Sequence, residues 1–84
     1  MNIKILLNND SKDIIGEFKA RKNATHKTII ENVKKYISKE YNCNVTRLLI
    51  TGSINYLTGV QDFSYILFGE NLPFRNIKII ETEV

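Results

Sequence analysis

Two short stretches decide the fold that this sequence predicts: Ile30-Glu31-Asn32-Val33-Lys34 and, after a short gap, Arg47-Leu48-Leu49-Ile50-Thr51-Gly52. In the first stretch, apolar residues begin at Ile29 or Ile30 and continue through Val33 at helical spacing, which predicts an amphipathic helix. In the second stretch, an apolar run ends at a glycine, which is typical of a β-strand followed by a turn.

The helix is predicted to start at Thr28, because Thr28 and Glu31 have the spacing of a capping box. Thr25 and Asn23 are rival N-caps, since their side chains also accept hydrogen bonds from a first helical turn. Asn42 is predicted to end the helix, because asparagine tolerates the left-handed conformation that often follows a last turn.

A hairpin is predicted before the helix. Apolar residues alternate with more polar ones over 3–7, which indicates a half-buried strand with Leu6 on its outward side. A dense turn signal at 8–13 leads into a second strand over 14–20. Gly16, inside that second strand, predicts a bulge or the close approach of another backbone.

The C-terminal half predicts two strands joined by a less regular segment. The third strand is expected over 45–51 and the last strand over 76–82, with Ile77 and Ile79 inward. Between them, residues 53–75 contain scattered turn residues and many apolar ones. We expect a short strand and a helical turn there, packed over the edge of the sheet.

The resulting order, ββαββ, predicts a single α+β domain over residues 1–84, in which a mixed sheet packs on one helix. The first and last strands are expected to pair in parallel at the sheet centre, since both are rich in isoleucine. The stretches 30–34 and 47–52, in this order, resemble ubiquitin and its β-grasp relatives. This resemblance implies a ubiquitin-like β-grasp roll that works by binding other proteins.

The chain differs from conjugated ubiquitin-like proteins at its end. Those proteins end in Gly-Gly, whereas this sequence ends Glu81-Thr82-Glu83-Val84. We therefore expect neither conjugation nor sulfur-carrier chemistry. Among ubiquitin-like proteins without Gly-Gly, the chain is similar to the accessory subunits of bacterial type VII secretion systems, which implies an adaptor or regulator.

The resemblance also implies a partner-binding surface. In ubiquitin, outward residues of the third and last strands form an apolar patch that partners bind, and the matching positions here are Leu49, Lys78 and Ile80. Leu6, outward on the first strand, extends this predicted patch. The alternative is that these residues are scattered singly over the surface, as exposed apolar residues often are.

A basic surface supports a competing hypothesis. The net charge is +3, and lysine and arginine residues precede the helix and follow its exposed side. They are Lys19, Arg21, Lys22, Lys27, Lys34, Lys35 and Lys39. Such residues favour a small nucleic-acid-binding or phage-encoded regulatory protein. Acidic residues are interleaved with them, so a solvated helix face is the alternative.

The sequence indicates no active site. His26 is the only histidine and Cys43 the only cysteine, which excludes an internal disulfide and a cysteine-based zinc cluster. We expect His26 to be solvated in a polar loop, and we expect neither an enzyme nor a cofactor. No apolar run is long enough for a membrane span or a signal peptide, so a cytosolic protein without membrane insertion is predicted.

Overall fold

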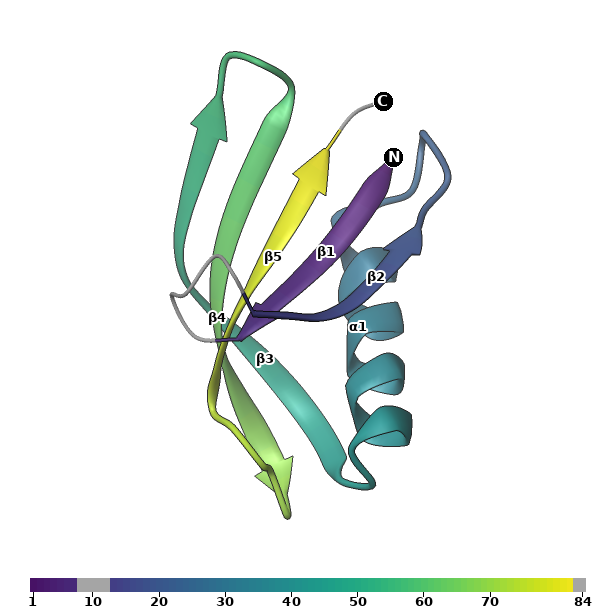
Figure 1. Cartoon of the computed structure of the whole chain (residues 1–84), viewed down its shortest axis with the longest axis vertical. Helices are drawn as coiled ribbons and strands as arrows, with labels where there is room; N and C mark the ends of the chain where they lie inside the picture. Colours follow the sequence, from purple (N-terminus) through teal and green to yellow (C-terminus); the bar gives the residue numbers. More distant parts are fainter. Residues whose placement is uncertain (8–12, 83–84) are drawn as a thin grey trace.

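The computed structural model describes residues 1–7 and 13–82. Within them the chain forms five strands and one helix (Figure 1). These are β1 (Asn2–Leu7), β2 (Ile14–Lys19), α1 (His26–Glu40), β3 (Asn44–Tyr56), β4 (Val60–Glu70) and β5 (Asn76–Thr82). The turn predicted at 8–13 lies outside the described residues except for Asp13, and so do the last two residues of the chain.

The strands form one sheet in the order β2-β1-β5-β4-β3, and all four neighbouring pairs are antiparallel. Helix α1 lies behind this sheet in Figure 1 and packs on that face. The opposite face, turned to the viewer, is here named the open face, because no helix or strand of residues 1–7 and 13–82 lies over it. In the same residues, no helix is long and apolar enough to cross a membrane.

The predicted ββαββ roll with a mixed sheet is therefore wrong. The segment 53–75 contains a full strand, β4, which lies between β3 and β5 in the sheet. Because β4 reverses the chain once more, β5 runs antiparallel to β1 at the sheet centre and not parallel to it. The ubiquitin-like arrangement that the resemblance implied is overturned by this extra central strand.

The expected short strand at the sheet edge and the expected helical turn are both wrong: 53–75 contains no helical turn, and its strand β4 has 11 residues, lies inside the sheet and carries apolar residues on both faces. Tyr65 and Leu67 are buried beneath the helix, while Ile66 and Phe68 lie on the open face. Such a continuous apolar run is typical of an interior strand and shows no alternation to detect. The expected strand end at Gly52 was also wrong, because β3 continues through a register shift at this point.

The core forms where the helix stripe meets the central strands. Ile29, Val33 and Ile37 of α1 are buried, which confirms the helical spacing and selects Ile29 over Ile30. They pack against isoleucines of the two central strands, namely Ile3 and Ile5 of β1 and Ile77 and Ile79 of β5. The predicted inward positions of the last strand are thus confirmed.

The helix begins one turn before the predicted start. Thr25 is the N-cap, and its Oγ1 accepts a hydrogen bond from the Thr28 backbone N–H at 3.3 Å. Glu31 does not reach back to close a capping box; its carboxylate pairs with Lys34 at 3.1 Å. The helix ends at Glu40, and Asn42 follows in the left-handed region with φ 49°, as predicted.

Gly16 stands where β2 meets the helix. The register of β1 and β2 shifts between Ile5 and Leu6, next to Gly16, which confirms the predicted bulge. The close neighbour is a side chain and not a backbone: the ring of Tyr36 lies on Gly16, and its hydroxyl donates to the Ile15 carbonyl at 3.3 Å. A Cβ added at residue 16 would overlap this ring, with Tyr36 Cζ at 2.8 Å.

We predict that Gly16→Ala destabilises the domain by about 1–3 kcal/mol, because the added methyl group forces the Tyr36 ring off β2. Gly52→Ala is the matched control, since a Cβ at this strand position meets nothing within 4 Å. It should change the free energy of unfolding by less than about 0.5 kcal/mol. Urea denaturation measures both variants, and equal effects would contradict the packing role of Gly16.

Candidate functional site

The open face brings the predicted partner-binding positions onto one side of the sheet. Leu49 of β3 lies opposite Ile66 of β4. Further along the open face, Ile54, Asp62 and Ile80 lie opposite one another across β3, β4 and β5. Leu49 and Ile80 therefore share the face predicted for them, but the row of Gly52, Ser64 and Lys78 separates them.

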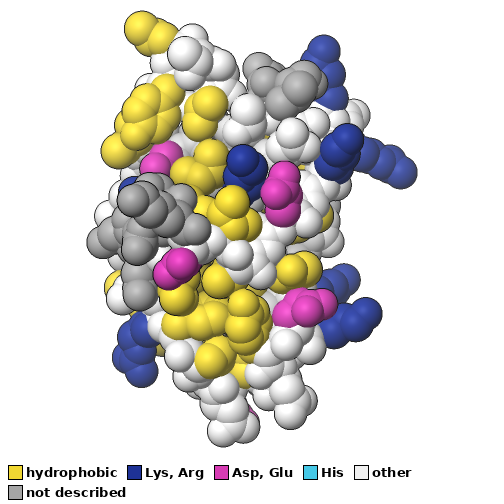
Figure 2. All heavy atoms as spheres, in the orientation of Figure 1, with side chains coloured by type: hydrophobic (Ala, Val, Ile, Leu, Met, Phe, Trp, Pro, Cys, Tyr) yellow, Lys and Arg dark blue, Asp and Glu magenta, His cyan; other side chains and the backbone are white. Residues whose placement is uncertain are grey.

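Apolar side chains on this face form two groups, one on each side of that row. The Leu49 group consists of Leu49, Ile66 and Phe68, and the Ile80 group consists of Ile54, Tyr56, Val60 and Ile80. Leu49 and Phe68 are each 40% exposed, and Ile54 is 51% exposed. Figure 2 shows apolar side chains over the lower and upper parts of the face, with charged ones between them.

The other two predicted patch residues have different surroundings. Lys78 lies between the two groups, and its Nζ is 3.4 Å from Oδ2 of the buried Asp62. This ion pair compensates a carboxylate that would otherwise be buried without a cation. Leu6 is on the open face by register, opposite Lys78, but only 5% of it is exposed. Leu6 therefore supports the sheet and offers little surface to a partner.

The basic residues lie on the side of the molecule formed by β2 and α1, where Figure 2 shows lysine and arginine side chains projecting from the edge. Lys19 and Arg21 line an open cavity of about 430 Å³ at the start of the helix. Asn23, Thr28 and Asn32 line it as well. The first helical turn carries no acidic residue, so this region is positive. Only Lys34 of the predicted basic set is paired with an acid among the described residues.

A second cluster of polar groups lies at the start of α1, on the helix side of the sheet. His26, the first helical residue, has its Nδ1 3.2 Å from Oε2 of Glu81 on β5. Its Nε2 contacts the hydroxyl of Tyr65 on β4. The ring also packs on Phe63, with centroids 4.6 Å apart. These contacts join the beginning of the helix to two strands. The His26 side chain is 44% exposed, as expected, but it lies in the helix and not in a loop, and both of its ring nitrogens have a partner.

The burial of Tyr65 determines the protonation of its own hydroxyl in this His26 cluster. Burial, and to a smaller extent the charge of Glu81, raise the pKa of the Tyr65 hydroxyl to about 12. The hydroxyl therefore keeps its proton at neutral pH, and in the tautomer with the proton on Nδ1 it donates to Nε2 while Nδ1–H donates to Glu81. A neutral His26 satisfies both neighbours in this arrangement. Tyr65 is 3% exposed and the His26 side chain 44% exposed, and the cluster links the start of α1 to β4 and β5 as a brace.

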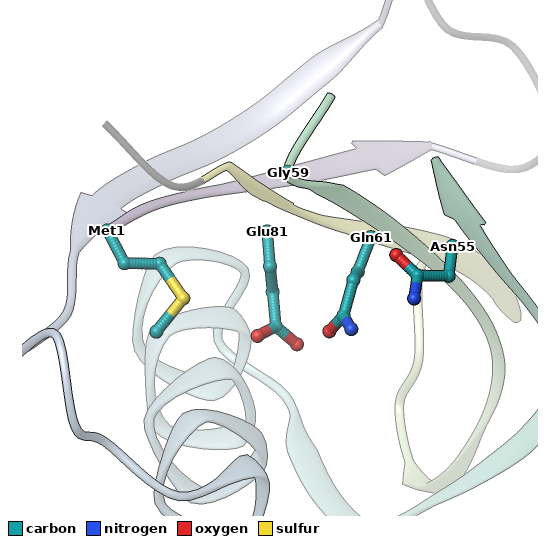
Figure 3. Close-up of a pocket in the computed structure, with 5 residues that line it drawn as sticks. All are labelled: Met1, Asn55, Gly59, Gln61 and Glu81. Atoms are coloured by element: carbon teal, nitrogen blue, oxygen red, sulfur yellow. The ribbon is translucent and has the colours of Figure 1, made fainter. Parts of the chain in front are cut away.

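A cavity of about 210 Å³ lies beside this cluster, lined by Met1, Asn55, Gly59, Gln61 and Glu81 (Figure 3). Asn55, Gln61 and Glu81 are neighbours across three strands, and Figure 3 shows their side chains pointing to the same side. The cavity presents one carboxylate and two side-chain amides, which both donate and accept hydrogen bonds. Among residues 1–7 and 13–82, no three His, Cys, Asp or Glu side chains are grouped so as to hold a metal ion.

The sequence contained one signal for the His26 cluster. Glu81 follows the inward Ile77 and Ile79 at the same two-residue spacing in the last strand. The pattern that buries the isoleucines therefore also buries a carboxylate. A buried carboxylate requires a hydrogen-bonding partner. That partner, His26, lies 55 residues away in the sequence, and no local pattern connects the two.

We predict that Tyr65→Phe destabilises the domain by about 1 kcal/mol at pH 7, because His26 Nε2 loses its donor. The native pKa of Tyr65 lies above the usual value near 10, so the folded state holds this proton more tightly than the unfolded state. The stability that the protonated Tyr65 hydroxyl contributes is complete below pH 10 and declines as the pH rises towards 12. Tyr65→Phe should remove this part of the pH dependence.

Urea unfolding at several pH values between 7 and 12 measures this effect, with the exposed Tyr56→Phe as the control. A Tyr65→Phe protein that is as stable as the wild type at pH 7 would contradict the brace.

Comparisons of the chain with models of protein families, with curated proteins and with solved structures each find no match. Membership of the ubiquitin-like family thus stays a prediction from the two sequence stretches, while the fold that it implied is corrected above.

Proposed function

We propose that this protein is a non-catalytic protein–protein interaction module that binds its partner on the open face of the sheet. The observation that carries the proposal is the unequal covering of the two faces. One face is buried by α1, whereas the other exposes Leu49, Phe68 and Ile54 at 40% or more. Large apolar residues gathered on one face are typical of a surface that another protein covers.

The chemistry of the face suggests the kind of partner. Arg47 lies over the ring of Phe68, with its guanidinium carbon 5.1 Å from the ring centroid, at the margin of the Leu49 group. Lys78 lies between the two apolar groups, where its ammonium already pairs with Asp62 at 3.4 Å. A partner with apolar residues bordered by acidic ones complements this pattern, and an amphipathic helix presents both kinds of residue on one side.

The role of the module in a cell rests on the sequence resemblance alone. An adaptor or regulator without conjugation chemistry, such as an accessory protein of a bacterial type VII secretion system acting in the cytosol, agrees with a small domain that offers a binding face. The His26 cluster supports this non-catalytic role, since its hydroxyl is buried and its polar groups bond one another.

We predict that the double variant Leu49→Ala/Ile80→Ala weakens partner binding by about 10–100-fold, because it truncates both apolar groups of the open face. Ile50→Ala is the matched control. Ile50 neighbours Leu49 in β3 and is 48% exposed, but it pairs with Tyr65 on the helix side of the sheet. Affinity capture with quantitative mass spectrometry identifies proteins retained by the wild type, and titration with the purified partner gives the dissociation constant.

Circular dichroism and thermal unfolding establish that each variant remains folded. Binding that survives Leu49→Ala/Ile80→Ala, or that is lost equally in Ile50→Ala, would refute the open face as the binding surface.

Nucleic-acid binding is the second candidate, favoured by the positive cavity at the start of α1. On this hypothesis, retention on nucleic acid falls steeply with salt, since each phosphate contact releases counterions. Lys19→Glu/Arg21→Glu should abolish it, because both residues line the cavity. Lys39→Glu, at the far end of the helix, should reduce it less. No retention at about 20 mM salt would remove this candidate.

A further inference from the structure

Two acidic side chains are buried in the described part of this fold, and they differ in what balances their charge. Asp62 on β4 and Glu81 on β5 are each 8% exposed. The Asp62 carboxylate lies 3.4 Å from the Lys78 ammonium on the open face. Glu81, on the helix side, pairs only with the His26 ring among the described residues. A neutral His26 gives Glu81 a hydrogen bond but no positive charge, so this buried carboxylate favours a cation beside it.

One oxygen of Glu81 is available to such a cation. Its Oε2 lies 3.2 Å from His26 Nδ1, whereas Oε1 makes no hydrogen bond to another described residue. Glu81 lines the cavity of about 210 Å³ in Figure 3, together with Met1. The Met1 ammonium, the other charged group among the lining residues, donates to the Ala20 carbonyl at 3.3 Å. The cavity therefore contains a carboxylate that the cations of the described chain leave unpaired.

The polar lining forms a row across three strands. Asn55 lies opposite Gln61, and Gln61 lies opposite Glu81. Residues opposite one another have Cβ atoms about 4.5–5.5 Å apart, so the row extends over about 10 Å. Asn55 and Gln61 are exposed, while Glu81 is buried. The cavity thus has amides at its open end and a negative charge at its closed end.

The size and the lining of the cavity indicate the kind of cation. A volume of about 210 Å³ exceeds the roughly 30 Å³ that one water molecule occupies, so the space suits an organic group better than a bare ion. An ammonium places its three donors on one atom. A guanidinium spreads five N–H donors in a plane, and this arrangement matches acceptors that stand in a row.

We propose that this cavity binds a guanidinium group. The guanidinium donates to Oε1 of Glu81 and to the side-chain oxygen of Gln61, with Asn55 as a further acceptor at the open end. The Met1 side chain flanks the row and covers the alkyl part of the ligand. A free guanidino compound and the arginine side chain of a polypeptide both supply this group.

This inference is independent of the proposed function, because the cavity lies on the helix side of the sheet and the proposed partner surface is the open face. Leu49→Ala truncates only the open face and should leave guanidinium binding unchanged. The two proposals can therefore fail separately, each in its own binding assay.

Nuclear magnetic resonance titration of the ¹⁵N-labelled protein with propylguanidinium at constant ionic strength tests the site. The side-chain amide signals of Asn55 and Gln61 and the backbone amide of Glu81 should shift together and saturate. The dissociation constant should be on the order of 1 mM, since the ligand has few atoms. Propylurea, a neutral molecule of similar shape, should bind at least about tenfold more weakly. Propylammonium, which lacks the planar donors, should bind about three- to tenfold more weakly.

Glu81→Gln should weaken propylguanidinium binding at least about tenfold, because it removes the charge and keeps an oxygen that accepts from His26. Asp62→Asn is the matched control. It removes the other buried carboxylate, on the open face, and should leave binding unchanged. The dispersion of the amide spectrum establishes that each variant is folded.

Gln61→Arg tests the same site if Glu81→Gln does not fold. The new guanidinium would stand opposite Glu81 on the neighbouring strand. It should abolish propylguanidinium binding and raise the midpoint of thermal unfolding, because opposite charges on paired strands attract. Gln61→Leu should weaken binding about threefold without this stabilisation, since it removes one neutral hydrogen bond.

A short peptide distinguishes the two sources of the ligand. Acetyl-Gly-Arg-Gly-amide is titrated in the same way, with citrulline in place of arginine as the neutral control. A peptide that binds more tightly than propylguanidinium supports an arginine side chain as the ligand. A peptide that binds no more tightly supports a free guanidino compound.

Four results would overturn the proposal. The first is the lack of any saturable shift up to about 30 mM propylguanidinium, well above the expected dissociation constant. The second is binding of propylurea or propylammonium as tight as that of propylguanidinium. The third is a folded Glu81→Gln protein that binds like the wild type. The fourth is a His26 ring that carries both protons at about pH 7.5 in ¹⁵N spectra, since Glu81 would then already have its cation.

Discussion

The structure depends on the burial of one helix stripe against the two central strands. Ile29, Val33 and Ile37 cover isoleucines of β1 and β5, and each of these side chains is at most 1% exposed. Complete burial of a side chain of this size contributes about 1.5–3 kcal/mol. A small domain buries a smaller fraction of its surface than a large one, so these buried side chains are a large part of its free energy of folding. The core therefore leaves the other face of the sheet free for contacts with another molecule.

Much of the fold was predictable because its signals are local. The helix stripe at Ile29, Val33 and Ile37 and the strand over 76–82 follow from the spacing of apolar residues, and both are confirmed. The strand within 53–75 was expected to be short and at the sheet edge because Tyr65–Phe68 is apolar on both faces and lacks the alternation that marks a half-buried strand. This error reversed the direction of β5 in the prediction and led to the wrong topology.

In the candidate sites, too, the features that depend on contacts between distant segments were not predicted. Leu49 and Ile80 were placed on one face because the resemblance to ubiquitin implied it, and the strand pairing puts both on the open face. Their separation by the row of Gly52, Ser64 and Lys78 depends on the pairing of β4, which was not foreseen. His26 and Glu81 meet only because the helix begins above β5, and this is a property of the assembled fold.

The position of β5 has a consequence for how the chain matures. β5 is the last strand in the sequence and also the centre of the sheet, where it joins β1 to β4. During synthesis, the hairpin of β1 and β2 and the hairpin of β3 and β4 emerge from the ribosome before the strand that connects them. Until β5 arrives, each hairpin exposes an apolar face and an unpaired edge. The core is therefore complete only when β5 has been made and has inserted between β1 and β4.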